Sequence, residues 1–204
     1  MPISDCEVRD PRMRRTRQLL QGALRKLMLT RSFDEIAVQD IAEVATVNRA
    51  TFYDHYADKY ALLEAMVAGG FHTLLHERNV QYDGGCPAAA QAIILAACDY
   101  LTQAHEGMEC ERQNAFEPLM DAAMTGAIRK VIIKGIVKFG SDTGLSAEMT
   151  ATAASWAISG AVKEWYRTPN HPPAEEVVPV IMQLVVPILM AANADGKGAN
   201  AALR

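Results

Sequence analysis

The sequence predicts an all-α fold with a small N-terminal three-helix unit and a larger C-terminal helical body. Apolar residues recur at helical spacing along most of the 204 residues, and no stretch competes seriously as a half-buried strand. The stretch 41–59, IAEVATVNRATFYDHYADK, orders a short helix, a tight turn, a capping Asn48 and a second short helix. This order is that of a helix-turn-helix.

Composition places the chain among ordinary soluble globular proteins. Half of its residues are hydrophobic and 22% are charged. No apolar run approaches the roughly 18–20 residues of a membrane span, and the segment MPISDCEVRDPRMRR lacks the apolar core of a signal peptide. We therefore expect a cytoplasmic protein without a membrane partner. The absence of a CxxC pair argues against a disulfide framework or a zinc finger among Cys6, Cys86, Cys98 and Cys110.

Charge is distributed unevenly in this chain, whose net charge is -4. Between Arg9 and Arg31 eight basic residues stand against the single acid Asp10, whereas ten basic and fifteen acidic residues follow Tyr60. A basic end on an acidic body is the electrostatic pattern of a protein that binds a polyanion. The alternative is a solvated helix end with no partner.

The first helix is predicted over about 12–30. Asp10 can cap it, and Pro11 suits its first helical position. Its front half carries the arginines. Its back half carries an apolar stripe made of Leu19, Leu20, Ala23, Leu24, Leu27 and Met28.

A connector then adds Phe33 and Ile36 to the same core. The second helix is predicted over 38–45, with Asp40 in its first turn, where a negative charge is favourable. Its inward residues are Ile41, Ala42 and Val44. A tight turn at Thr46-Val47 follows.

The third helix, 49–56, begins after the cap Asn48, and Asp58 caps a fourth helix that reaches about Val80. The pair Gly69-Gly70 inside this fourth helix indicates close packing or a flex point. The segment YDGGCP then breaks the chain. Further helices are predicted over 87–104, 116–140, 146–167 and 173–192. The expected domains are 1–60 (core 12–58) and 61–194, followed by a flexible tail at 195–204.

The segment from Arg12 to Val67 resembles the N-terminal domain of the TetR (tetracycline-repressor) family of bacterial transcription regulators. The resemblance rests on the order of DIAEVA, the apolar Val47 in the turn, the runs TFY and HY, and Lys59 with two leucines behind it. The rest of the chain matches the family in length and helical character alone. The resemblance implies a DNA-binding regulator rather than an enzyme. Such a regulator represses by binding a palindromic operator as a homodimer, and a small-molecule effector releases it.

Two positions depart from the family pattern. Ala37 stands where the family usually has a threonine that caps the second helix, and the missing cap costs about 1 kcal/mol. Thr46 stands where the turn usually has glycine, so a left-handed backbone there is strained. Both departures concern local stability and turn geometry, and neither changes a group that faces DNA.

The resemblance, together with the fit of an α-helix to the major groove, assigns DNA contacts. The residues expected nearest to bases are Asn48, Arg49, Ala50 and Thr51. The residues expected at phosphates are Arg12, Arg14, Arg15, Tyr53, His55 and Lys59. Lys59 and the amide groups at the start of the fourth helix form a phosphate clamp in this interpretation. Phe52 is expected in the core, and Tyr56 fits either the core or a phosphate contact. Asp54 either points away from DNA or accepts from a cytosine amino group.

The last two helices are the candidates for a homodimer interface. Small residues in the helix over 146–167 would allow a partner helix to approach closely. The predicted interface residues are Ala154, Ile158, Ala161, Trp165, Ile181, Leu184 and Ile188. An adjacent face carries Ala153, Ala157 and Gly160. The alternative is that both helices only fill the core of one protomer.

The segment between about residues 82 and 139 is the candidate effector-binding body. A mainly apolar pocket with a few polar groups is the usual form of a small-molecule site. The residues predicted to line it are Tyr100, His105, Asn114, Phe116, Met120, Met124 and Trp156. Each of them also fits a plain core position.

Two groups of residues also fit other kinds of function. His72 and His76 lie one helical turn apart, a spacing that can bind a metal with a third ligand from Glu77, Cys86, His105 or Cys110. Three cysteines, Cys86, Cys98 and Cys110, could sense oxidants. An enzyme is the alternative from a different class, but the chain contains no phosphate loop, nucleotide fingerprint, nucleophile elbow or HExxH motif. No cofactor is expected. A DNA-binding protein of the same fold without an effector, such as a nucleoid or division factor, is the remaining alternative.

Overall fold

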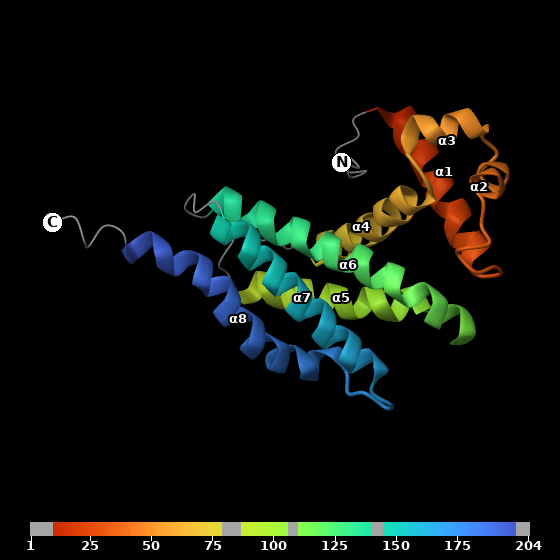
Figure 1. The fold of residues 1–204 in the computed structure, drawn as a ribbon. Coiled ribbons are helices and arrows are strands. Elements are labelled where there is room, and N and C mark those ends of the chain that lie inside the picture. Colours follow the sequence, from red (N-terminus) through yellow and green to blue (C-terminus); the bar gives the residue numbers. More distant parts are fainter. Residues whose placement is uncertain (1–9, 79–86, 106–109, 140–144, 199–204) are drawn as a thin grey trace. The chain divides into compact units, whose positions relative to one another are not determined.

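The computed structural model describes residues 10–78, 87–105, 110–139 and 145–198. These residues form eight α-helices and no strand, so the predicted all-α class is confirmed (Figure 1). The helices are α1 (Pro11–Met28), α2 (Val38–Val44), α3 (Arg49–His55), α4 (Lys59–Glu77), α5 (Pro87–His105), α6 (Cys110–Phe139), α7 (Leu145–Arg167) and α8 (Ala174–Gly198).

Local capping explains where the N-terminal helices begin. The Asp10 carboxylate accepts from the backbone N–H of Arg12 at 2.8 Å, and Pro11 occupies the first position of α1. The Asp58 carboxylate accepts from the N–H of Ala61 at 2.7 Å at the start of α4. Both predicted caps are therefore confirmed.

The core of the N-terminal unit lies among α1, α2, α3 and the connector between α1 and α2. The three helices pack against one another (red to orange in Figure 1). Their fully buried side chains are Leu20, Leu24, Ile36, Ile41 and Phe52. Two residues predicted to point inward, Leu19 and Val44, are exposed instead. Each lies at the edge of its helix stripe, where the helical turn has already carried the side chain away from the core.

The chain forms two compact units, and their boundary within α4 falls after Gly70. One unit contains α1 to α3, α4 up to Gly70 and α6 up to Ala123. The other contains α4 from Phe71, α5, α6 from Met124, α7 and α8. The predicted boundary at 60/61 lies earlier, at the first residues of α4. The glycine pair noted in the sequence therefore lies at the point where α4 passes from one unit to the other.

The second unit contains a long helical core of its own. Its buried side chains include Ile94, Ile128 and Val162, and α7 packs against α8. Two prolines, Pro179 and Pro187, lie inside α8, which nevertheless runs without interruption from Ala174 to Gly198. None of the described helices is long and apolar enough to cross a membrane.

The turn between α2 and α3 carries the expected backbone strain. Thr46 has φ 55°, in the left-handed region that favours glycine. Its hydroxyl lies 2.7 Å from the carbonyl oxygen of Ala45, and its N–H donates to the carbonyl of Glu43. The turn geometry is kept although the residue is unfavourable for it, because the packing of α2 and α3 fixes both ends.

We predict that Thr46→Gly stabilises the protein by about 1 kcal/mol, because it removes the left-handed penalty of a β-branched residue. Urea unfolding would measure the free energy. Thr46→Ala is the matched control, since alanine keeps a Cβ and should gain less than glycine. Equal stability of the glycine and alanine variants would contradict the assignment of strain to this turn.

Candidate nucleic-acid interface

The start of α3 presents a small polar surface built around its cap. The side-chain oxygen of Asn48 accepts from the Thr51 backbone N–H at 2.7 Å and from the Thr51 hydroxyl at 3.0 Å. Asn48, Arg49 and Ala50 are exposed, and Thr51 is half-buried. The four residues predicted nearest to bases therefore occupy the cap and the first turn of one helix, where a DNA-reading helix presents its side chains.

Arg49 and Tyr53 form a pair along the exposed side of α3. The Arg49 guanidinium donates to the Tyr53 hydroxyl at 3.2 Å and lies 5.5 Å from the centre of its ring. Tyr53 is 46% exposed. Because the Tyr53 oxygen accepts from Arg49, its own proton is directed to another acceptor, as a phosphate contact would require.

The opposite side of α3 holds the helix in the core. Phe52 is fully buried, as predicted. Tyr56 is also buried; its hydroxyl bonds to the Gln21 amide nitrogen at 3.1 Å, and the Arg17 guanidinium lies 4.7 Å from its ring centre. Tyr56 therefore packs against α1. Arg17 is buried beside Tyr56. Its charge alone does not predict this burial, but its place in the sequence, between Thr16 and the apolar residues of α1 that begin at Leu19, is a signal for it. His55, a predicted phosphate contact, is half-buried at the end of α3.

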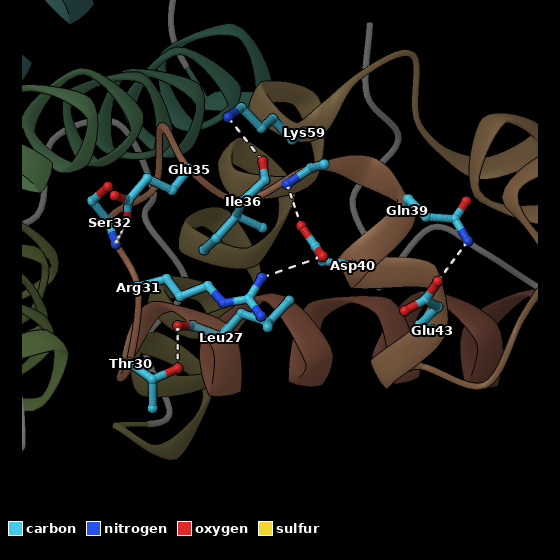
Figure 2. Close-up of polar contacts among 11 residues, drawn as sticks. Leu27, Thr30, Arg31, Ser32, Glu35, Ile36, Gln39, Asp40, Glu43 and Lys59 are labelled. Carbon is cyan, nitrogen blue, oxygen red and sulfur yellow. Dashed lines mark hydrogen bonds and ion pairs between the residues drawn. The ribbon is translucent and has the colours of Figure 1, made fainter.

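Lys59, which is predicted to clamp a phosphate, forms hydrogen bonds within the protein. Its ammonium donates to three backbone carbonyl oxygens of the connector between α1 and α2: Phe33 at 2.9 Å, Asp34 at 3.1 Å and Ile36 at 3.0 Å. Figure 2 shows the bond to Ile36. The ammonium also lies 4.8 Å from the centre of the Phe33 ring. Since an ammonium has only three N–H groups, all of them are used within the protein in this geometry, and a phosphate contact by Lys59 would have to replace one of these bonds. The phosphate clamp therefore stays a prediction.

Asp40 ties α2 to the same connector. Its carboxylate accepts from the backbone N–H of Ala37 at 2.8 Å and pairs with Arg31 at 3.2 Å (Figure 2). The Ala37 bond, followed by the Arg31 bond, lowers the pKa of the Asp40 carboxyl. Ala37 itself caps nothing, since its methyl group cannot accept a hydrogen bond. The Asp40 carboxylate therefore compensates in part for the missing cap, because it accepts from the backbone N–H of Ala37 at the start of α2.

The predicted basic end lies in the first turns of α1. Arg12, Arg14 and Arg15 are exposed there, where a phosphate could reach them. They belong to the same compact unit as α3. Their exposure is compatible with phosphate contacts, which stay a prediction.

The residues predicted for the dimer interface divide into two groups. Ala154, Ile158, Trp165 and Ile181 are buried within one protomer, and the indole nitrogen of Trp165 donates to the carbonyl of Pro172 at 2.8 Å. Their burial within one protomer contradicts their assignment to an exposed protomer surface. Ala161 and Ile188 are half-buried, and only Leu184 is strongly exposed.

A different stripe of α7 and α8 is exposed and apolar. On α7 it contains Met149, Ala153, Trp156 and Gly160. On α8 it contains Val180, Leu184 and Pro187. We call these seven residues the apolar stripe. The sequence had pointed to it through Ala153 and Gly160, but helical spacing alone could not say which face of α7 the protomer core would take.

The predicted pocket residues are only partly within the described side chains. Tyr100, Met120 and Met124 are buried. Trp156 is 66% exposed in the apolar stripe, which contradicts its assignment to an enclosed pocket. His105, Asn114 and Phe116 lie outside the described side chains. Ser159, which the prediction missed, has a buried hydroxyl without a hydrogen-bond partner among the described residues.

Neither sensing alternative gains a site from the described side chains. His72 is half-buried and His76 exposed, and no group of three His, Cys, Asp or Glu residues suited to a metal occurs in that part of the chain. Three possible third ligands, Cys86, His105 and Cys110, lie outside the described side chains. Cys98 is buried, and burial raises the pKa of its thiol to about 12, which keeps it in the unreactive thiol form.

We predict that Lys59→Met destabilises the N-terminal unit by about 1–3 kcal/mol, because three connector carbonyls lose a charged donor. Urea unfolding would measure the loss, with Lys26→Met at an exposed position of α1 as the control. For DNA binding, we expect an unchanged salt dependence in Lys59→Met. A slope reduced by about one unit with unchanged stability would instead support the phosphate clamp.

Comparison with known proteins gives a direct match to this N-terminal unit. A family model described as bacterial regulatory proteins of the tetR family matches residues 20–66. An uncharacterised HTH-type transcriptional regulator of Bacillus subtilis, YxbF, is 41% identical over 59 residues. The matched stretch covers 28% of this chain and 16% of the relative. The sequence similarity therefore concerns the helix-turn-helix domain.

Solved structures extend the comparison to the fold of most of the chain. A TetR transcriptional regulator from Streptococcus agalactiae 2603V has a TM-score of 0.53 at 17% identity, covering 88% of this chain and 98% of that structure. The dihydroxyacetone kinase operon activator DhaS has a TM-score of 0.50 at 19% identity, covering 87% of this chain and 98% of its own. These likenesses show the fold alone. With the domain match, they show that the chain carries a DNA-binding helix-turn-helix domain of the bacterial tetR regulatory family at residues 20–66 and shares the all-helical fold of these solved structures.

Proposed function

We propose that the chain represses transcription by binding a palindromic operator as a homodimer, and that a small-molecule effector releases it. The observation that carries this proposal is the division of α3 into two sides. Phe52 and Tyr56 are buried against the core, while Asn48, Arg49 and Ala50 are exposed at the start of the helix. A helix fixed on one side and polar at its exposed N-terminal turn suits the major groove.

The electrostatic arrangement supports the same function. Arg12, Arg14 and Arg15 are exposed at the start of α1, in the compact unit that contains α3. Phosphate contacts of this kind set affinity and register without reading sequence. The overall charge of -4 does not oppose binding, because the acidic residues lie mainly after Tyr60.

A second copy of the chain is the proposed partner of the apolar stripe. Trp156 is 66% exposed and Leu184 61% exposed, on two helices that pack together. Large exposed apolar side chains at one surface are typical of an interface. Gly160 leaves open space around the position of a Cβ, which allows a partner helix to approach. A two-fold dimer would place two reading helices on the two halves of a palindrome.

The effector is proposed to bind among the C-terminal helices. Tyr100 and Met124 supply buried surface there. The Ser159 hydroxyl adds a buried polar group whose hydrogen bond an effector could complete. Effector binding would favour release only if the effector binds the DNA-free state more tightly than the DNA-bound state.

Selection from random duplex DNA tests the DNA-binding part of the proposal. We expect enrichment of a palindrome and loss of that enrichment in Arg49→Gln. Lys130→Gln, at an exposed position of α6 in the other unit, is the charge-matched control. Binding without any sequence enrichment would favour a nucleoid-type protein instead. Effector screening on the selected operator would then test release.

We predict that Trp156→Glu and Leu184→Lys each convert the dimer to a monomer, because they place a charge in an apolar interface. Light scattering would give the mass. Operator affinity should fall by about 10²- to 10⁴-fold, since two linked readers bind with high effective concentration. Val137→Lys, at a 72% exposed position on α6, is the control. Variants that stay dimeric would show that the interface lies elsewhere.

A further inference from the structure

We propose that the reading surface of α3, made of Asn48, Arg49, Ala50 and Thr51, selects keto bases, whose major-groove edge carries a carbonyl acceptor. Guanine would lie opposite Arg49, and guanine or thymine opposite Asn48. This inference rests on the proposed function and specifies the DNA that it recognises. It follows from which hydrogen-bonding atoms of the two side chains are already used within the protein.

The carbonyl oxygen of Asn48 is occupied. It accepts from the Thr51 backbone N–H at 2.7 Å and from the Thr51 hydroxyl at 3.0 Å. A backbone N–H can only donate, so the side-chain atom facing it must be the oxygen. The atom that Asn48 can offer to DNA is therefore its amide nitrogen, a donor.

This arrangement excludes the usual asparagine–adenine pair. That pair needs the asparagine oxygen to accept from adenine N6 while the nitrogen donates to N7. With its oxygen held in the cap of α3, Asn48 can supply only the second of these bonds. Freeing the oxygen would break the cap, which would lower the equilibrium constant for forming the first turn of α3 about tenfold. A base edge that offers acceptors matches Asn48 better.

Arg49 adds donors to the same surface. It is exposed, and only one of its guanidinium nitrogens bonds to Tyr53. Guanidinium has five N–H donors and no acceptor. Guanine offers two acceptors side by side, N7 and O6, whereas adenine places an amino group beside N7.

Asn48 and Arg49, the first two residues of the reading surface, thus both offer hydrogen-bond donors to a base. Guanine O6 and thymine O4 accept in the major groove, while the amino groups of adenine and cytosine donate. Ala50, exposed next to these donors, can contact the methyl group of thymine. Further along α3, acceptors are offered by the Thr51 hydroxyl, whose proton is given to Asn48, by the Tyr53 hydroxyl, which already accepts from Arg49, and by the exposed Asp54.

The test uses the full chain and the palindrome obtained by selection. Asn48→Asp keeps a good cap acceptor and replaces the amide donors with a second acceptor. We expect the base preference at one position per half-site to invert, from guanine or thymine to cytosine or adenine. Comparing bases within the same variant removes the uniform effect of the added charge. Thermal unfolding would confirm that the cap is kept.

Modified bases test the Arg49 contact. Replacing the assigned guanine by 7-deazaguanine removes the N7 acceptor, and we expect affinity to fall roughly 5- to 150-fold. Hypoxanthine at the same position is the control, because it keeps both N7 and O6 and should bind as guanine does. In Arg49→Gln, the difference between guanine and 7-deazaguanine should shrink markedly.

The outcomes separate the two proposals. Adenine selected at the position that responds to Asn48→Asp, or no loss with 7-deazaguanine, would overturn the keto-base inference and leave operator binding intact. Absence of any selected sequence would overturn both. A keto preference that inverts in Asn48→Asp supports both.

Discussion

The reading surface depends on the burial of one side of α3 in the small core of the N-terminal unit. Phe52 is fully buried, and Tyr56 is held by Gln21 and stacked under the Arg17 guanidinium of α1. α3 has only seven residues, and an isolated helix of that length does not persist in water. Its conformation, and thus the placement of every exposed group on it, comes from this packing. The buried Arg17 also shows that part of the basic charge in α1 is used inside the protein.

Polar contacts add to the apolar packing at the connector between α1 and α2. In the connector between α1 and α2, the Lys59 ammonium binds the carbonyl oxygens of Phe33, Asp34 and Ile36. Asp40 acts at the other end of the connector through Ala37 and Arg31. The first residue of α4 is therefore bonded directly to the segment that positions α2. Any movement of α4 relative to this unit would have to keep or break those three bonds.

Individual residues show how far sequence reasoning reached. Asp10, Asn48 and Asp58 were predicted as caps, and all three accept the expected backbone bond, because capping depends on residues within one turn. Thr46 was predicted to be strained if the turn kept its left-handed form, and its φ is 55°. By contrast, Lys59 was assigned to phosphate and lies on three carbonyls that are more than twenty residues away in sequence. A lysine at the start of a helix fits either role, so the sequence alone does not distinguish a phosphate contact from a bond to these carbonyls.

The sequence by itself determined the helices, the caps and the helix-turn-helix, since these follow from spacing and from short-range chemistry. The tertiary structure decided which face of each helix is buried in the protomer and which is exposed. Ala154 and Ile158 became core and Trp156 became surface, although all three lie on one helix with a small-residue pattern around it. Helical periodicity shows that a helix has an apolar face, but α7 has apolar residues on two faces. The packing of α7 within the protomer, where it contacts α8, determines which of these faces remains exposed for a partner.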